Sequence, residues 1–198
     1  MRMLLCAAFF TLHASLFTAC SEADDTVEEY ANWQEKNETY FEQQYEVHAF
    51  SSSTLQFVLK NYTLGDEVSV AQAAHTSCIL VDVLESGTDT SASPLYTDKV
   101  KVHYSGRLLP SASYPNGYTF DSSYTGTLDD ETSSPVEFSV NGLVPGFMTA
   151  LQHMHRSDYW RVTIPYQLGY GTAGSGSIPA YSTLIFDIKL VDFYQDED

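Results

Sequence analysis

Histidine, cysteine and serine side chains can ligate metals or act as nucleophiles, and this sequence contains all three types. His153 and His155 form an H-x-H pair, but they follow a helical pattern in which these positions point apart, and no third ligand accompanies them. The serine-rich stretches contain no nucleophile elbow. Cys78 begins a compact apolar run, which predicts a buried strand residue. We therefore expect a site without a metal, a cofactor or a covalent step.

Residues 141–154 read N-G-L-V-P-G-F-M-T-A-L-Q-H-M, and the rest of the chain is organised around this stretch. Its apolar stripe, with a period of 3.6 residues, comprises Val144, Phe147, Met148 and Leu151. Pro145 suits a first helical turn, where the missing N–H costs nothing. The pattern predicts one short helix that forms the floor of a binding pocket.

The segments around this helix alternate between apolar and polar residues or form short apolar runs, as strands do. They cover residues 55–59, 78–84, 100–105, 136–140, 160–164 and 184–190. One helix among several such strands predicts an α+β fold, with an antiparallel sheet wrapped over the helix.

The 198-residue chain is long enough for one domain with an extension, and it is strongly acidic. Nine Lys and Arg residues stand against 26 Asp and Glu, a formal net charge of −17. Such a surface repels phosphate backbones, which argues against nucleic-acid binding.

Residues 1–20 have the order of a secretory signal: Arg2, an apolar run over 3–17, and small residues before Cys20. The ending resembles a bacterial lipoprotein signal and predicts lipid attachment at Cys20, although an ordinary cleaved signal stays open. The acidic residues 21–25 resemble a signal that routes lipoproteins to the outer face of the outer membrane, or they form a plain solvated tether. We expect a cell-envelope location, as an outer-membrane lipoprotein facing the periplasm or the surface.

The segment 28–45 lacks Gly and Pro and is rich in helix formers, which predicts an amphipathic helix in an N-terminal extension. Its stripe near helical spacing comprises Tyr30, Trp33, Asn37, Tyr40 or Phe41, and Gln44. We expect the stripe to pack on the protein's own body, with a partner surface as the alternative. The predicted organisation is a signal over 1–20, a tether and mainly helical extension over 21–77, a main domain over 78–193, and an acidic tail over 194–198.

Five strings in the main domain follow one another in the order and approximate spacing of the FKBP family of peptidyl-prolyl cis–trans isomerases. They are V-H-Y-S-G (102–106), F-D-S-S (120–123), G-L-V-P-G-F (142–147), I-P-Y-Q-L-G-Y-G (164–171) and I-P-A-Y-S-T-L-I-F-D-I-K-L (178–190). Each string alone is weak evidence for the family, but the five strings together, in order over about 115 residues, resemble this family closely.

The resemblance implies a curved antiparallel sheet of five or six strands around one short helix, with an apolar hollow that holds a proline of a peptide. It assigns catalytic roles to Tyr104, Asp121 and Tyr170. It assigns substrate-binding roles to Phe120, Phe138, Leu143, Val144, Phe147, Ile178 and Phe186. The same resemblance allows macrolides as ligands and a homodimer through the N-terminal helix.

The implied activity is rotation about X-Pro bonds, which needs no cofactor. Amide resonance creates a barrier of about 18–20 kcal/mol. A dry aromatic pocket favours the less polar twisted amide, and so stabilises the transition state more than the planar substrate. In the family, the Tyr170 hydroxyl and the Ile178 backbone N–H would each donate to a ligand carbonyl.

Several positions depart from the family pattern. Phe147 replaces the commonest Trp, Val136 stands where an aromatic is usual, and Ser177 stands where an apolar residue is usual. Residues 124–134 contain no Lys or Arg, so Asp121 lacks its usual basic partner.

The resemblance predicts a lipid-anchored isomerase that acts on proline-containing segments and assists the folding of exported or surface proteins. The departures keep open a catalytically weak binding or chaperone module of the envelope. A surface lipoprotein that binds glycan or a host protein is a third hypothesis, which rests on the acidic tether and on two predicted loops, 108–119 and 124–134, that are longer than in the minimal domain of the family.

Overall fold

A computed structural model describes residues 28–195 of the protein. The predicted leader, Cys20 and the acidic tether lie outside the described residues, as do residues 196–198 of the acidic tail. Within the described part, neither helix is both long and apolar enough to cross a membrane.

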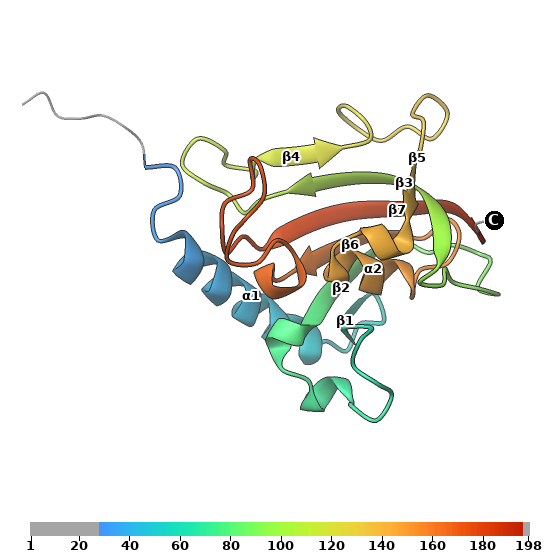
Figure 1. The fold of residues 1–198 in the computed structure, drawn as a ribbon, viewed down its shortest axis with the longest axis horizontal. Coiled ribbons are helices and arrows are strands. Elements are labelled where there is room, and N and C mark those ends of the chain that lie inside the picture. Colours follow the sequence, from blue (N-terminus) through green and yellow to red (C-terminus); the bar gives the residue numbers. More distant parts are fainter. Residues whose placement is uncertain (1–27, 196–198) are drawn as a thin grey trace, which may run out of the picture.

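Seven strands form one antiparallel sheet that curves around a short helix, α2 (Figure 1). The strands are β1 Gln56–Lys60, β2 Cys78–Glu85, β3 Asp98–Arg107, β4 Thr119–Ser122, β5 Val136–Ser139, β6 Tyr159–Ile164 and β7 Leu184–Gln195. Their order is β1-β2-β6-β7-β3-β4, and β5 pairs with β3 beside β4. The predicted α+β fold class is therefore confirmed.

The helices are α1 Trp33–Ala49 and α2 Pro145–Leu151, and the 3-10 turns are Val70–Gln72, His75–Ser77, Val140–Gly142 and Tyr166–Leu168. The prediction of a helix over 141–154 was too long at both ends. Pro145 occupies the first helical position, and it forces Val144 into an extended conformation with ψ 148°. After Leu151 the chain turns to enter β6.

The main core lies between α2 and the face of the sheet that it covers. Phe147, Met148 and Leu151 of the predicted stripe are buried there. Gly146 lets the helix approach closely, because a Cβ at this position would lie 2.3 Å from Cγ2 of Ile164. The buried faces of the strands supply the other wall of this core.

The sheet has one strand more than the five or six that the family resemblance implied, because β1 of the extension joins it. β1 pairs with β2 along its whole length, from Gln56 opposite Asp82 to Lys60 opposite Cys78. β7 is also longer than predicted and continues to Gln195, beyond the expected boundary at residue 193. The sequence pattern predicted the first addition as a strand over 55–59, and it missed only the extension of β7 beyond residue 190.

The predicted amphipathic helix exists, but it starts later and ends later than expected. Its buried residues are Trp33, Asn37, Phe41 and His48, so the stripe packs on the protein's own body, as predicted. Residues 28–32 form turns instead, because the Glu29 carboxylate accepts hydrogen bonds from Ser111 and Ser113. The pKa of Glu29 is lowered by these bonds.

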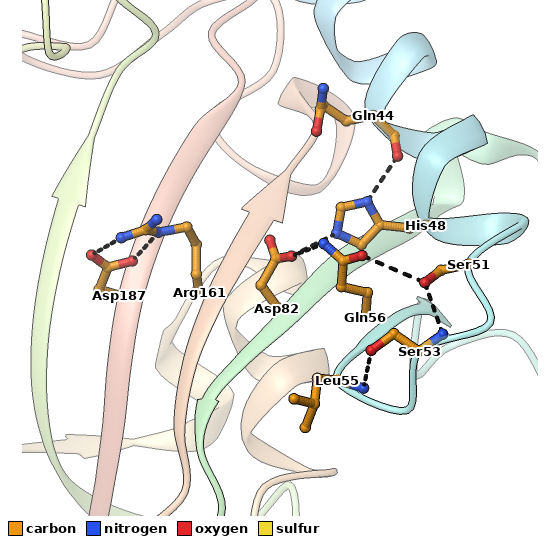
Figure 2. Close-up of polar contacts among 9 residues, drawn as sticks. All are labelled: Gln44, His48, Ser51, Ser53, Leu55, Gln56, Asp82, Arg161 and Asp187. Atoms are coloured by element: carbon orange, nitrogen blue, oxygen red, sulfur yellow. Dashed lines mark hydrogen bonds and ion pairs between the residues drawn. The ribbon is translucent and has the colours of Figure 1, made fainter.

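The end of α1 is fastened to the sheet by a cluster of polar side chains (Figure 2). His48 Nδ1 donates to the Gln44 carbonyl at 2.8 Å, and Nε2 lies 3.4 Å from Oδ1 of Asp82 on β2. Gln56 Nε2 on β1 donates to the same oxygen at 2.8 Å. Because both ring nitrogens of His48 face oxygen atoms, the folded protein favours the imidazolium.

Burial opposes a charge on His48 and is the largest single influence on the pKa of this side chain. The hydrogen bonds and charge of Asp82, together with the Gln44 carbonyl, outweigh burial and raise the pKa of His48 above 6.5. The His48 bond, with help from Gln56, lowers the pKa of Asp82 below 3.8. Asp82 on β2 is therefore connected to α1 by its ion pair with His48 and to β1 by the hydrogen bond from Gln56.

Candidate active site

A pocket of about 640 Å³ opens between α2 and the curved sheet. All ten side chains that the family resemblance selected line it: Tyr104, Phe120, Asp121, Phe138, Leu143, Val144, Phe147, Tyr170, Ile178 and Phe186. They come from strands β3, β4, β5 and β7, from the start of α2 and from the segment before β7. The curvature of the sheet brings together residues that are up to 82 positions apart, from 104 to 186.

The base of the pocket is built from aromatic rings packed edge to face. The Phe147 and Phe186 ring centroids are 5.0 Å apart, with an interplanar angle of 81°. Tyr104 lies 6.2 Å from Phe147 and 5.6 Å from Phe138, and Phe120 lies 5.5 Å from Phe186. Such pairs prefer this geometry and hold one another in place, so the pocket keeps an apolar base.

Gly106 lies against two rings of the pocket, although it was not among the residues selected from the sequence. A Cβ at this position would lie 2.5 Å from Cε1 of Phe186 and 2.6 Å from Cζ of Phe120. The absence of a side chain on β3 therefore makes room for two of the aromatic rings. The signal was present in the sequence, because Gly106 follows Tyr104 by two residues and so shares its face of the strand.

The polar group of the pocket is the pair Tyr104 and Asp121. The Tyr104 hydroxyl donates to Oδ2 of Asp121 at 2.6 Å, and the Ser122 amide donates to Oδ1 at 2.9 Å. Ser123 Oγ accepts from the Tyr104 amide at 2.9 Å, which anchors the tyrosine backbone beside β4. Neutral donors thus hold the Asp121 carboxylate, although residues 124–134 supply no basic partner.

The electrostatic environment keeps Tyr104 protonated. Burial is the main cause, and the hydrogen bond and the charge of Asp121 act in the same direction, so the pKa of Tyr104 lies far above 10. A phenol that stays protonated at physiological pH is a permanent donor. Tyr104 therefore remains a donor to the Asp121 carboxylate at physiological pH.

One edge of the pocket is formed by residues 169–183, which we call the rim loop. Tyr170 is 38% exposed there and lines the pocket. The Ile178 N–H donates to the Ser175 carbonyl at 2.9 Å, and the Ser175 N–H donates back to the Ile178 carbonyl at 2.9 Å. Gly176, with φ 55°, occupies the turn between them. The Ile178 N–H, which the family resemblance assigns to a ligand carbonyl, therefore takes part in a tight turn in this conformation.

The other side chains considered for chemistry lie outside this pocket. His153 Nδ1 is 2.8 Å from the Thr149 carbonyl, and His155 Nδ1 is 3.5 Å from Oδ2 of Asp158. Within residues 28–195 no three His, Cys, Asp or Glu side chains are grouped as a metal site. Cys78 is fully buried at the start of β2, as predicted, and burial raises the pKa of its thiol to about 11.

A curved antiparallel sheet that closes an aromatic pocket over one short helix defines an FKBP-type fold. The sequence pattern of the FKBP-type peptidyl-prolyl cis-trans isomerases matches residues 91–191, and the chain belongs to this family.

Two curated relatives are each similar over about half of the chain. The FKBP-type 22 kDa peptidyl-prolyl cis-trans isomerase of Escherichia coli (strain K12) is 42% identical over 102 residues, 51% of this chain and 44% of the relative. The macrophage infectivity potentiator of Trypanosoma cruzi is 43% identical over 100 residues, 50% of this chain and 45% of the relative. The chain thus spans less than half the length of these relatives.

Solved structures show the same fold over more of the chain. FkpA from Escherichia coli superposes with a TM-score of 0.58 and 26% identity, covering 84% of this chain and 63% of FkpA. A peptidyl-prolyl cis-trans isomerase from Pseudomonas syringae pv. tomato superposes with a TM-score of 0.57 and 24% identity, covering 86% of this chain and 99% of that structure. The second likeness concerns the fold alone.

Proposed function

We propose that this protein is a peptidyl-prolyl cis–trans isomerase that binds the proline of an X-Pro segment in the 640 Å³ pocket. One observation carries the proposal. An aromatic base of interlocking rings and one oriented carboxylate, Asp121 held by Tyr104, occur together in a pocket with the size of a small-ligand site.

The chemistry follows from the apolar walls. Rotation about the prolyl bond passes through a twisted amide, whose carbonyl is less polar than that of the planar form. Phe147, Phe186 and Phe120 exclude water, so the hydrated planar state loses more stabilisation than the twisted state. Lowering the barrier by about 6 kcal/mol would accelerate rotation by roughly four decades.

Polar groups at the edge orient the peptide while the bond turns. The exposed Tyr170 hydroxyl can donate to a substrate carbonyl, and the Asp121 carboxylate polarises the pocket near the reacting amide. The Ile178 N–H becomes available only if the Ser175 carbonyl releases it or shares it. No bond to the substrate forms or breaks in this mechanism.

The test is the rate of cis–trans exchange in short X-Pro peptides, measured by NMR exchange or by a protease-coupled assay. Asp121→Ala and Tyr170→Phe should lower kcat/KM. Tyr96→Phe is the matched control, because Tyr96 is similarly exposed but lies outside the pocket. A macrolide that competes with the peptide would place the activity in this pocket. A folded protein that accelerates no X-Pro peptide would refute the enzyme.

The second candidate function is a binding or chaperone module with weak catalysis. The engaged Ile178 N–H favours it, because the site then lacks one free donor for orienting the peptide. Ser177, which lines the pocket where an apolar residue is usual, makes the same edge more polar. Macrolide or peptide binding without acceleration would support this module over the enzyme.

The proposed setting is the cell envelope, where the protein would assist the folding of exported or surface proteins. The signal-like residues 1–20 and the position of Cys20 support a lipid anchor in the outer membrane. Labelling with radioactive palmitate that disappears in Cys20→Ser would establish the anchor. Labelling that persists in this variant would exclude attachment at Cys20.

A homodimer through α1 is also a proposal. The aromatic stripe of α1 is already buried against the sheet of its own chain, so a dimer would have to use the opposite, polar face of the helix. Sedimentation equilibrium would decide between monomer and dimer. A dimer that persists after charged substitutions on that exposed face would show that the contact lies elsewhere.

A further inference from the structure

The rim loop carries two proposed substrate contacts, Tyr170 and Ile178, yet it contains neither a strand nor an α-helix. Its turns depend on residues with positive φ: Gly171, Gly174, Gly176 and Tyr181. A tyrosine with φ 62° persists only where the surrounding structure holds it. The position of this edge of the pocket is therefore set by whatever the rim loop packs against.

The first such support is the indole of Trp33, at the start of α1. Its Nε1–H donates to Ser182 Oγ at 2.8 Å in a buried contact between residues 149 positions apart. Ser182 Oγ in turn donates to the Pro179 carbonyl at 2.7 Å. This relay connects α1 to the residue directly after Ile178.

The second support is Asn37, one turn further along α1 and fully buried. Its Oδ1 accepts from the Thr183 N–H at 2.7 Å, and its Nδ2 donates to the Trp33 carbonyl at 2.7 Å. A buried amide that satisfies a backbone N–H of another segment is costly to remove, because the N–H would be left without a partner. Asn37 therefore fixes the point at which the rim loop enters β7.

The third support acts just before the rim loop. The Tyr166 hydroxyl donates to Oε1 of Glu38 at 3.1 Å, and the Tyr166 ring packs edge to face against Tyr181 at 5.2 Å. Trp33, Asn37 and Glu38 of α1 thus contact the end of the rim loop and the segment just before it.

We propose that α1 is a positioning element of the isomerase site, with Trp33 and Asn37 as positioning residues that set the rim loop and hence Tyr170 and Ile178. This inference rests on the proposed function of the pocket. It gives the N-terminal segment a role in substrate binding, although neither residue lines the pocket.

The test compares Trp33→Phe and Asn37→Ala with His48→Gln as the matched control. His48 fastens the other end of the same helix to Asp82 (Figure 2), away from the rim loop. Trp33→Phe removes the indole donor and keeps an aromatic ring, so it preserves most of the packing. Amide hydrogen exchange of residues 170–181, kcat/KM for an X-Pro peptide, and the Kd of a macrolide are measured at a temperature where every variant is folded.

In both positioning variants the rim-loop amides should exchange faster. kcat/KM should fall by about tenfold or more, since a misplacement of about 1 Å can cost about a hundredfold. His48→Gln should change both quantities less than about twofold even if it lowers the melting temperature as much.

Unchanged exchange and kcat/KM in the two folded positioning variants would overturn the inference. Equal effects of all three variants would also overturn it, because α1 would then act only through global stability. If the wild-type protein is inactive but rim-loop exchange rises selectively, the coupling stands and only the assigned activity fails.

Discussion

The hydrogen bond from Tyr104 to Asp121 offers the most direct test of the proposed mechanism. At 2.6 Å it is short and charge-assisted, and such bonds contribute about 1.5–3 kcal/mol. The Asp121 residue is solvent-exposed, so we expect the lower end, about 1.5 kcal/mol, because water competes for the carboxylate. If the bond orients Asp121 in the transition state, Tyr104→Phe should lower kcat/KM by about tenfold.

A double-mutant cycle separates this bond from other effects of the two side chains. Tyr104→Phe, Asp121→Ala and the double variant are compared in the X-Pro exchange assay, with urea unfolding to show that each is folded. Because both substitutions remove the same bond, the double variant should be about as active as the worse single variant. Additive losses, or a Tyr104→Phe variant within about twofold of wild type, would refute the reasoning.

Three further predictions concern packing, pH and reactivity. Gly106→Ala should destabilise the fold by about 1–3 kcal/mol and weaken macrolide binding, because the new methyl group collides with two rings of the pocket; urea unfolding and calorimetry measure this. His48→Gln should lower the melting temperature most between about pH 4 and 6.5, where His48 is charged and Asp82 is ionised, and the difference from wild type should shrink above that range. Cys78 should resist a thiol reagent at pH 8 in the folded chain without its first 20 residues, and react when urea unfolds it, because burial raises its pKa to about 11.

The sign of the His48 effect follows from its raised pKa. The contribution of His48 to stability is complete below its unfolded pKa of 6.5, and it is lost as the pH rises through the pKa of the folded state. The lowered pKa of Asp82 acts in the other direction, so its contribution is lost as the pH falls through the folded value. A difference between variant and wild type that grows towards alkaline pH would contradict the ion pair, as would a Gly106→Ala protein with unchanged macrolide affinity. Rapid labelling of folded Cys78 would show that the start of β2 opens readily.

The sequence was informative where a local pattern determines structure. Six of the seven strands were predicted within a few residues, β2 from a compact apolar run and the others from alternating segments. The exception is β4, Thr119–Ser122, for which no strand was predicted. Pro145 and the apolar stripe located α2, and the family resemblance selected ten residues that line one pocket. The roles of these ten residues stay predictions.

The sequence was less informative wherever a contact joins distant segments. The start of α1 moved from residue 28 to Trp33, because Glu29 bonds to Ser111 and Ser113 instead of continuing a helix. The engaged Ile178 N–H was also missed, since a turn formed with Ser175 depends on backbone angles that no residue type specifies alone.

By itself the sequence determined the fold class, the family and ten of the residues that line the pocket, because periodicity and short motifs depend on neighbours within a few positions. Only the tertiary structure decided that Gly106 makes room for aromatic rings, that Asp82 joins three elements, and that Asn37 supports the rim loop. These contacts join residues 14 to 146 positions apart and depend on how curved elements pack, so no local pattern encodes them. Their physical basis is burial: a polar group removed from water needs a partner, and the fold determines which one lies within reach.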